Sequence, residues 1–352
     1  MSKKRSKAKS RNAIIISLTA SQLYIACMYA KRLSECGISV IVVCKGRIRD
    51  LDFSKAERFK ILRLPVYSFR EKVYVKVKYD YLFNFSYLGR VIRKETDVYF
   101  FNEKESITRK LLKYSKYKVT MIEEGIGEYF SYFDPFGKNE KINHADVGFP
   151  DLFKESHPDF TGCINQFVYA DIFNRHESVW FSELLRFRNS QKISDIPILY
   201  AGQPLDEFSV KTERELLLSL FRILSSKRKV YIKPHPRESA EKYDFLCEQY
   251  PDIVILNNDY GVLPLECMTF LFHISCMITF ESSGGVNAAL INKDIQIIFL
   301  CYIQEFSALK ELIRLDDEIV VTRLLERIDN IKKPKTISEL VKLVDMQDCP
   351  CK

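Results

Sequence analysis

The chain has 352 residues, of which 47% are hydrophobic and 28% are charged, and this composition excludes an intrinsically disordered protein. A chain of this length can bury two hydrophobic cores, so we expect two domains. Lysine and arginine number 54 against 46 aspartate and glutamate, which gives a formal charge of +8. This charge favours an anionic substrate, nucleic acid or an anionic membrane surface as the partner, without distinguishing among them. The 10 cysteines include no Cys-x-x-Cys pair, so we expect reduced thiols in a cytosolic protein, and neither a disulfide framework nor zinc.

Residues 1–12 are basic and are predicted to form a disordered tail. An apolar stretch over 13–30 follows, but Ser17 and Thr19 interrupt it, so it is predicted to form a strand and a helix and not a membrane span. No small-residue cleavage site follows this stretch, which argues against a signal peptide. Two alternatives stay open for the tail: a solvated end, or peripheral contact with an anionic membrane, where each basic residue contributes about 1 kcal/mol.

Apolar runs alternate with helical patterns over 13–122, and this alternation predicts βαβ units and a mainly parallel sheet. The middle, from 128 to about 194, is aromatic and poorly periodic, so we expect long functional loops and a passage between domains. A second alternation over 196–300 predicts another doubly wound sheet. The predicted strands are 13–17, 38–44, 61–66, 97–101, 118–122, 196–201, 230–232, 253–256, 276–280 and 295–300. The predicted helices are 22–36, 81–94, 105–117, 213–226, 239–250, 263–273 and 286–291.

The predicted fold is therefore α/β, with two Rossmann-like doubly wound domains and a cleft between their strand ends. We place the first domain at 13–194, the second at 195–335 and a C-terminal tail at 336–352. The chain has neither a GxGxxG sequence nor a Walker phosphate loop. Their absence argues against dinucleotide oxidoreductases and P-loop ATPases.

A short predicted strand in the second half runs into basic residues separated by prolines. Pro234 and Pro236 cannot continue a strand ladder, so the chain must leave the sheet there. Lys233 and His235 would then follow the strand's carboxyl end, which is the edge where open α/β sheets bind ligands. An imidazole that titrates near neutral pH and is flanked by cations suits a phosphorylated ligand.

Small and hydroxyl-bearing residues follow the predicted strand 276–280. Ser282, Ser283 and Gly284 begin a helix there and form a candidate anion site, although the serines can equally cap the helix and bind nothing. Glu266 lies near the start of the preceding helix. Its carboxylate can favour the helix dipole or accept hydrogen bonds from ribose hydroxyls.

Two adjacent carboxylates follow the predicted strand 118–122. Burying the carboxylates of Glu123 and Glu124 there would cost free energy, so we expect them to be solvated or to have a function. Gly125 supplies the turn that follows. One glutamate is a candidate general base, and an ordinary exposed turn is the alternative. Asp206, which follows Gly202-Gln203-Pro204-Leu205 at another strand end, is a competing candidate base.

No metal site is predicted, because no carboxylate or cysteine lies at the spacing of metal ligands from His144, His176 or His273, and His157 is predicted to lie in a loop with a proline-fixed turn. His273 is predicted to end an apolar helix and to be structural. The chain also has no zinc pattern and no clear RNA-binding signature, so we expect no nucleic-acid partner despite the positive charge.

Three motifs in this chain resemble those of bacterial sialyltransferases of the GT-B type. These enzymes carry a D/E-D/E-G, a His-Pro and a Ser-Ser motif in the same order, and polysialyltransferases share all three. Here they are Glu123-Glu124-Gly125, His235-Pro236 and Ser282-Ser283. A further likeness to family 52 glycosyltransferases lies in Thr19-Ala20-Ser21-Gln22-Leu23, Gly202-Gln203-Pro204-Leu205 and Pro264-Leu265-Glu266, so the resemblance covers most of residues 13–300.

The resemblance implies an inverting sialyltransferase that moves sialic acid from CMP-sialic acid to a surface glycan, such as lipooligosaccharide, O-antigen or capsule. The first domain would face the acceptor and the second would bind the CMP-sugar. No metal ion and no cofactor are implied, because protein donors can stabilise a departing nucleoside monophosphate. The implied catalytic residues are Glu123 as the base and His235 on the leaving group. The implied donor-binding residues are Pro236, Glu266, Ser282 and Ser283, with Glu124, Gly125 and Gly284 as structural members of the motifs. Lys233 is added to the donor-binding residues from its position at the strand end and not from a motif, and an exposed lysine without a role is the alternative.

The partners implied by the resemblance are a CMP-sugar donor and a lipid-linked glycan acceptor. Such acceptors are presented at the inner leaflet, so we expect a cytoplasmic protein that contacts the inner membrane of a bacterium only peripherally. Two alternatives stay open: a transferase for another CMP-activated acidic sugar, such as Kdo or a sialic-acid relative, and a non-catalytic two-lobed nucleotide-sugar-binding protein. The linkage, the acceptor, the number of residues added and homo-oligomer formation are not determined by the sequence.

Overall fold

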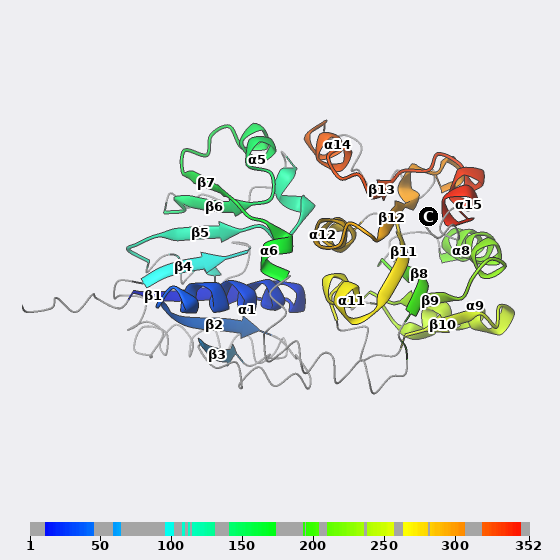
Figure 1. The fold of residues 1–352 in the computed structure, drawn as a ribbon, viewed down its shortest axis with the longest axis horizontal. Helices are drawn as coiled ribbons and strands as arrows, with labels where there is room; N and C mark the ends of the chain where they lie inside the picture. Colours follow the sequence, from blue (N-terminus) through cyan, green and yellow to red (C-terminus); the bar gives the residue numbers. More distant parts are fainter. Residues whose placement is uncertain are drawn as a thin grey trace, which may run out of the picture. The chain divides into compact units, whose positions relative to one another are not determined.

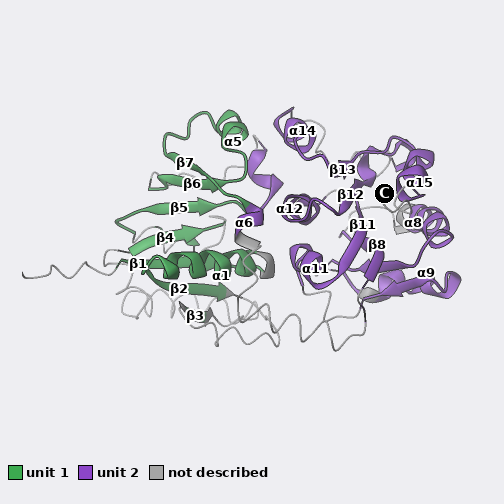
Figure 2. Ribbon diagram, in the orientation of Figure 1, with its two compact units in different colours: residues 1–124, 131–168, 175–180 green, residues 125–130, 169–174, 181–352 purple. Residues whose placement is uncertain are grey.

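Two parallel β-sheets organise the chain, and each is the centre of one compact unit (Figures 1 and 2). Unit 1 comprises residues 1–124, 131–168 and 175–180, and unit 2 comprises 125–130, 169–174 and 181–352. The computed structural model describes residues 11–45, 59–64, 96–101, 108–109, 112, 115–130, 141–173, 193, 195–203, 210–235, 238–256, 263–280, 282–306 and 319–345. No described helix combines the length and the apolar character that a membrane crossing requires.

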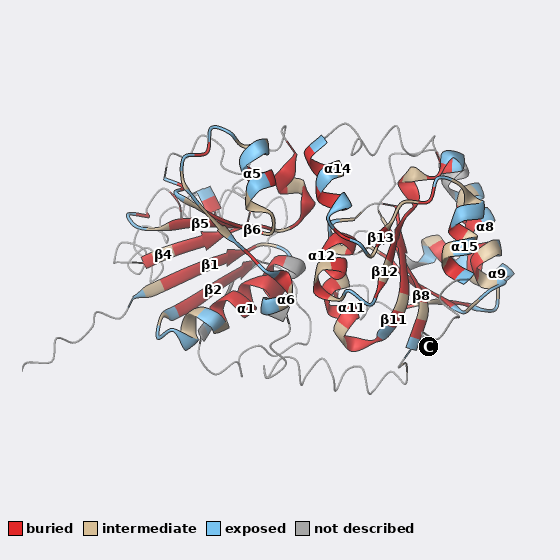
Figure 3. Ribbon diagram, turned by 45° about the horizontal axis from the view of Figure 1, so that its top comes forward, coloured by how far each residue is buried: buried red, intermediate tan, exposed pale blue. Residues whose placement is uncertain are grey.

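Unit 1 contains a sheet with the strand order β3-β2-β1-β4-β5-β6-β7. Its first strand, β1, lies inside the sheet next to the middle strand β4, and the connections reverse direction between β1 and β4, as in a doubly wound fold. Apolar runs such as Ile14 to Ile16 are fully buried, as expected for parallel strands covered on both faces (Figure 3). The strands are β1 (Asn12–Ser17), β2 (Ser39–Lys45), β3 (Phe59–Leu64), β4 (Thr96–Phe100), β5 (Val119–Ile122), β6 (His144–Val147) and β7 (Cys163–Gln166). The described helices are α1 (Ala20–Glu35) and α5 (Pro150–Ser156).

Unit 2 repeats this design with the strand order β10-β9-β8-β11-β12-β13. The strands are β8 (Asp195–Ala201), β9 (Val230–Lys233), β10 (Ile253–Ile255), β11 (His273–Thr279), β12 (Gln296–Phe299) and β13 (Ile331–Lys332). The α-helices are α6 (Tyr169–Phe173), α8 (Val210–Ser225), α9 (Asp244–Gln249), α11 (Leu265–Leu271), α12 (Ser283–Ile291), α14 (Ile319–Glu326) and α15 (Ile337–Asp345). Short 3-10 helices are η2 (Ile126–Tyr129), η3 (Ala240–Tyr243), η4 (Leu300–Tyr302) and η5 (Gln304–Phe306).

The carboxyl ends of three neighbouring strands in unit 2 are level with one another. Ala201 of β8 pairs with Lys233 of β9 on one side and with Thr279 of β11 on the other. Adjacent strands are about 4.8 Å apart, so the residues that follow these three strands emerge at one edge of the sheet. The winding reverses between β8 and β11, and open α/β sheets bind ligands at such a point.

The α/β fold with two doubly wound sheets, predicted from the alternation of apolar and helical patterns, is confirmed, and so are all ten predicted strands with shifts at their ends. The prediction of long loops over 128–194 is wrong for the described residues 141–173, which contribute α5, α6 and two further strands, β6 and β7. Strand β6 was missed because it is short and carries a carboxylate, Asp146. The structure accommodates this buried group by hydrogen bonds from the Tyr29 hydroxyl and from Asn165 Nδ2, the latter 2.7 Å long.

Smaller predictions are also corrected. His273 does not end a helix: α11 stops at Leu271, and His273 begins β11 as an exposed residue 3.7 Å from Asp195. The predicted tail 336–352 contains α15, whose Leu340 and Val344 are buried in the core of unit 2. The predicted helix 81–94 lies outside the described residues. Of the predicted helix 105–117, the described residues 108–109 and 112 are helical and 115–117 are not.

Candidate functional site

Lys233 is the last residue of β9 and is only 4% exposed. Burial lowers the pKa of its ammonium group from 10.5 to about 8, and the nearby carboxylate of Glu266 partly opposes this shift. His235 follows two residues later and is partly buried, at the sheet edge where the sequence placed it. Pro236 and Asp206, the other candidates around these strand ends, lie outside the described residues. A buried cation therefore ends β9, and an imidazole follows it two residues later.

Glu266 lies in the first turn of α11 and is 4% exposed. Its Oε1 accepts a hydrogen bond of 2.8 Å from Asn287 Nδ2 of α12. Burial raises the pKa of the Glu266 carboxyl group, and the Asn287 bond and the charge of Lys233 act in the opposite direction. Glu266 and Lys233 are thus two buried ionisable groups that interact electrostatically near the carboxyl end of β9. Contact of Glu266 with a ribose stays a prediction.

The Ser-Ser motif forms the start of α12. Ser282 is the N-cap residue in extended conformation, and its side chain makes no capping hydrogen bond. The capping role that the sequence left open for Ser282 is therefore not what the structure shows. Gly284 packs closely against α11, because a Cβ atom there would be 3.1 Å from Leu265 Cδ1. The motif thus combines a helix N-terminus, two hydroxyls and a close approach of two helices.

Gly125, the last residue of the acidic motif, packs against Ser283, the second residue of the Ser-Ser motif. A Cβ atom on Gly125 would lie 2.6 Å from Ser283 Cβ and 3.0 Å from Ser283 Oγ. The amide of Gly125 donates a hydrogen bond of 3.1 Å to Glu128 Oε2. Glycine is needed here because any side chain would collide with the side chain of Ser283. Parts of two motifs that are far apart in the sequence therefore meet within unit 2.

The two glutamates of the acidic motif belong to unit 1 and have different surroundings. Glu123 is 2% exposed, and its Oε2 accepts a hydrogen bond of 2.6 Å from the amide of Gly148. Glu124 is partly exposed, and its Oε2 accepts a hydrogen bond of 2.7 Å from Gln22 Nε2 in the first turn of α1. The positive end of a helix favours a carboxylate at that position. A backbone amide thus holds the carboxylate of Glu123, and a side chain at the start of α1 holds that of Glu124.

Sequence reasoning missed two polar residues around these motifs, Asn287 and Glu238. Asn287 is 1% exposed within the apolar helix α12, and a lone amide in such a helix is a signal that could have identified it. Glu238 accepts a hydrogen bond from the backbone amide of His235, and its spacing of three residues from that histidine is too common to be a signal. Within the described ranges, no group of three or more histidine, cysteine, aspartate or glutamate residues could hold a metal ion.

Comparison with known proteins gives one family match. The profile of the alpha-2,8-polysialyltransferase (POLYST) family matches residues 72–301, a range that contains all three motifs. A comparison with curated protein sequences finds no match. The family match supports a glycosyltransferase of the sialyltransferase kind, and therefore an enzyme.

Solved structures similar to the chain include two bacterial sialyltransferases. The GT-B domain of the Photobacterium damselae sialyltransferase has a TM-score of 0.51 at 11% identity and covers 91% of this chain and 98% of that chain. The 2,6-sialyltransferase of Photobacterium sp. JT-ISH-224 has a TM-score of 0.50 at 12% identity, with 92% and 78% covered. The UDP-GlcNAc 2-epimerase of Methanocaldococcus jannaschii reaches 0.56 at 12% identity, with 97% and 93% covered. At these low identities, the structural similarity shows the fold alone. It confirms the predicted GT-B class.

Proposed function

Because the chain belongs to the alpha-2,8-polysialyltransferase family, we propose that it transfers sialic acid from CMP-sialic acid to a hydroxyl of a glycan acceptor, with inversion at the anomeric carbon. One observation carries this proposal: the matched range contains the acidic, His-Pro and Ser-Ser motifs together. The geometry of unit 2 supports it, since β9 and β11 end level with each other and their motifs follow at the same edge of the sheet.

In this proposal, residues of unit 2 stabilise the departing CMP. The bond between the anomeric carbon and the phosphate oxygen breaks, and negative charge develops on the phosphate of CMP. His235 donates a proton or a hydrogen bond to this phosphate, and Ser282 and Ser283 hold its other oxygens at the start of α12. Lys233 adds a positive charge, and Glu266 binds the ribose. Preorganised donors of this kind stabilise a departing phosphate, so we expect transfer to continue in the presence of EDTA.

The acceptor hydroxyl must lose a proton as its oxygen bonds to the anomeric carbon. We assign this proton to Glu123, whose carboxylate is held in place by the amide of Gly148 at 2.6 Å. Asp206 is the competing base. Glu124, which Gln22 anchors to α1, is assigned a structural role.

The decisive experiment measures release of CMP from CMP-sialic acid by the purified protein, with and without acceptor. Glycans ending in sialic acid are the first acceptors to test, because the family is described by alpha-2,8-polysialyl transfer. We expect His235→Ala to abolish CMP release. His273→Ala is the matched control, since this histidine is exposed at the opposite end of β11 and should leave release unchanged.

Several results would change the assignment. Release of CMP from CMP-Kdo but not from CMP-sialic acid would identify another acidic sugar as the substrate. Tight CMP binding without release from any CMP-sugar, with every acceptor tried, would favour a non-catalytic binding protein. Equal release by wild type and His235→Ala would remove the imidazole from the mechanism. Linkage analysis of the product then identifies the glycosidic linkage. Transfer to a lipid-linked acceptor tests whether the enzyme acts on glycans at a membrane.

A further inference from the structure

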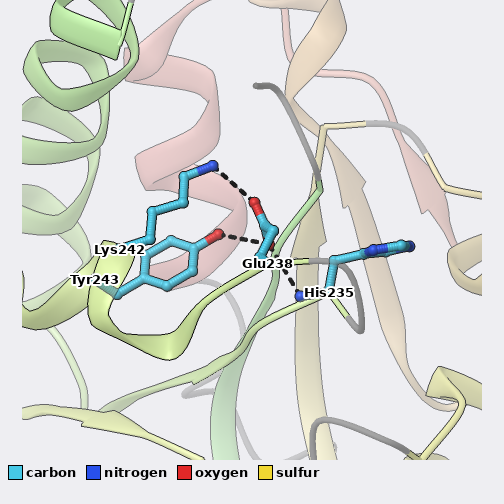
Figure 4. A network of polar contacts seen from close by, with 4 residues as sticks. All are labelled: His235, Glu238, Lys242 and Tyr243. Carbon is cyan, nitrogen blue, oxygen red and sulfur yellow. Dashed lines mark hydrogen bonds and ion pairs between the residues drawn. The ribbon is translucent and has the colours of Figure 1, made fainter. Parts of the chain in front are cut away.

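Glu238, three residues after His235, has a fully buried carboxylate, because 0% of its side chain is exposed. Its Oε2 accepts hydrogen bonds from the backbone amide of His235 at 2.9 Å and from the Tyr243 hydroxyl at 3.1 Å. Its Oε1 accepts a bond of 2.7 Å from Lys242 Nζ (Figure 4). Burying a carboxylate is costly unless donors compensate for the lost water, and three donors do so here.

Glu238 and His235 are joined by two backbone-directed bonds. The amide of Glu238 donates to the carbonyl oxygen of His235 at 2.8 Å, while the amide of His235 donates to the carboxylate of Glu238. This reciprocal pair fixes the peptide groups on both sides of His235. Figure 4 shows the imidazole directed away from the carboxylate. Glu238 therefore holds the backbone from which the ring projects and does not contact the ring.

Gly202, the residue after β8, leaves the space that the carboxylate of Glu238 occupies. Its amide donates a hydrogen bond of 2.9 Å to the carbonyl oxygen of Lys233, which places it beside the end of β9. A Cβ atom on Gly202 would lie 2.5 Å from Glu238 Oε2, 2.5 Å from the Tyr243 hydroxyl and 3.3 Å from the amide nitrogen of His235. A side chain at this position would displace the carboxylate. Gly202, which the resemblance singled out without a role, thus belongs to the support of His235.

Tyr243 connects this network to the core of unit 2. It is 0% exposed and packs edge-on against Tyr200 of β8, with the ring centroids 6.2 Å apart. The hydroxyl of Tyr243 therefore links the carboxylate to the buried core of unit 2. A group held by packed neighbours keeps its geometry better than one on an unsupported loop.

We propose that Glu238 is a positioning residue for the transfer reaction, with Gly202 providing its clearance. Glu238 fixes the backbone of His235 and thereby aims the imidazole toward the phosphate of the donor. The inference rests on the proposed function for the task of the imidazole, but the support of the His235 backbone can be tested without it. A misplacement of about 1 Å in a catalytic group can cost about a hundredfold in rate.

The test compares Glu238→Ala, Glu238→Gln and Gly202→Ala by kcat, by KM for donor and acceptor, and by thermal unfolding. Glu238→Ala should lower kcat by roughly a hundredfold while KM for the acceptor stays within about twofold. Glu238→Gln keeps an oxygen for the His235 amide and should restore most of the turnover. Gly202→Ala should resemble Glu238→Ala, although it leaves the carboxylate in the chain.

Leu246→Ala is the control for a general loss of stability. Leu246 is 0% exposed in the core of unit 2, so its truncation should lower Tm at least as much as Glu238→Ala. We expect this variant to keep near-normal kcat. An equal loss of kcat in Leu246→Ala at a matched fall in Tm would overturn the positioning role, as would normal kcat in Glu238→Ala.

Amide hydrogen exchange of His235 separates this inference from the proposed function. The chain has 5 histidines, so 15N-histidine labelling gives few signals, and His235→Ala identifies the one that belongs to position 235. Exchange at this amide should accelerate in Glu238→Ala and stay slow in Glu238→Gln and Leu246→Ala. Unchanged exchange in Glu238→Ala would overturn the inference even if CMP is released. Accelerated exchange would support it even if the substrate proves to be a different CMP-sugar.

Discussion

The lowered pKa of Lys233 predicts how CMP binding depends on pH. Burial brings this pKa to about 8, so the ammonium group is about nine-tenths protonated at pH 7 and about one-tenth protonated at pH 9. An ordinary lysine, with a pKa of about 10.4, stays almost fully charged over this range. If only the protonated form binds the phosphate, the apparent Kd rises as the competent fraction falls. CMP affinity should therefore weaken roughly tenfold between pH 7 and pH 9, which is about 1.4 kcal/mol.

Titration calorimetry of CMP binding at a series of pH values measures this effect. The second pKa of a phosphate monoester is about 6, so the ligand stays a dianion over most of the range. Lys233→Met should bind CMP weakly, with an affinity that no longer falls between pH 7 and pH 9. Lys229→Met removes an exposed lysine just before β9 and should keep the wild-type pH dependence. A flat wild-type profile, or the same rise of Kd in Lys233→Met, would refute the role of Lys233.

Two further predictions concern the acidic motif. Glu123→Ala should lower kcat by roughly a hundredfold or more, because general-base catalysis contributes on that scale, while CMP affinity stays near normal. Near-normal turnover of this variant would move the role of base to Asp206. Gly125→Ala should destabilise the fold by about 1–3 kcal/mol and weaken CMP binding, because the new methyl group would displace Ser283, which it would approach to 2.6 Å. Gly127→Ala is its control, since a Cβ atom there would meet nothing within 4 Å; equal CMP affinity in the two variants would contradict the importance of the Gly125 contact.

The strands were predictable because parallel strands buried on both faces are short apolar runs, such as Val230 to Ile232, that can be identified without any partner. The prediction that His235 and Ser283 follow strands of one sheet at the same edge is confirmed, because the carboxyl ends of parallel strands align. Strand β6 was missed for the opposite reason. Its Asp146 looks unsuited to a buried strand, and only its hydrogen-bonding partners from other elements make it tolerable there.

By itself, the sequence determined the α/β class and the two doubly wound sheets. It also contained the three motifs, all of which lie in the range that the family profile matches. Only the tertiary structure decided which motif residues touch, how far Lys233 is buried, and that Glu238 holds the backbone of His235. Periodicity and composition report the local preference of a segment for a strand or a helix. The contact of Gly125 with Ser283 and the fit of Glu238 beside Gly202 depend instead on how segments far apart in the chain pack together. A local sequence pattern contains no information about which distant residues come into contact.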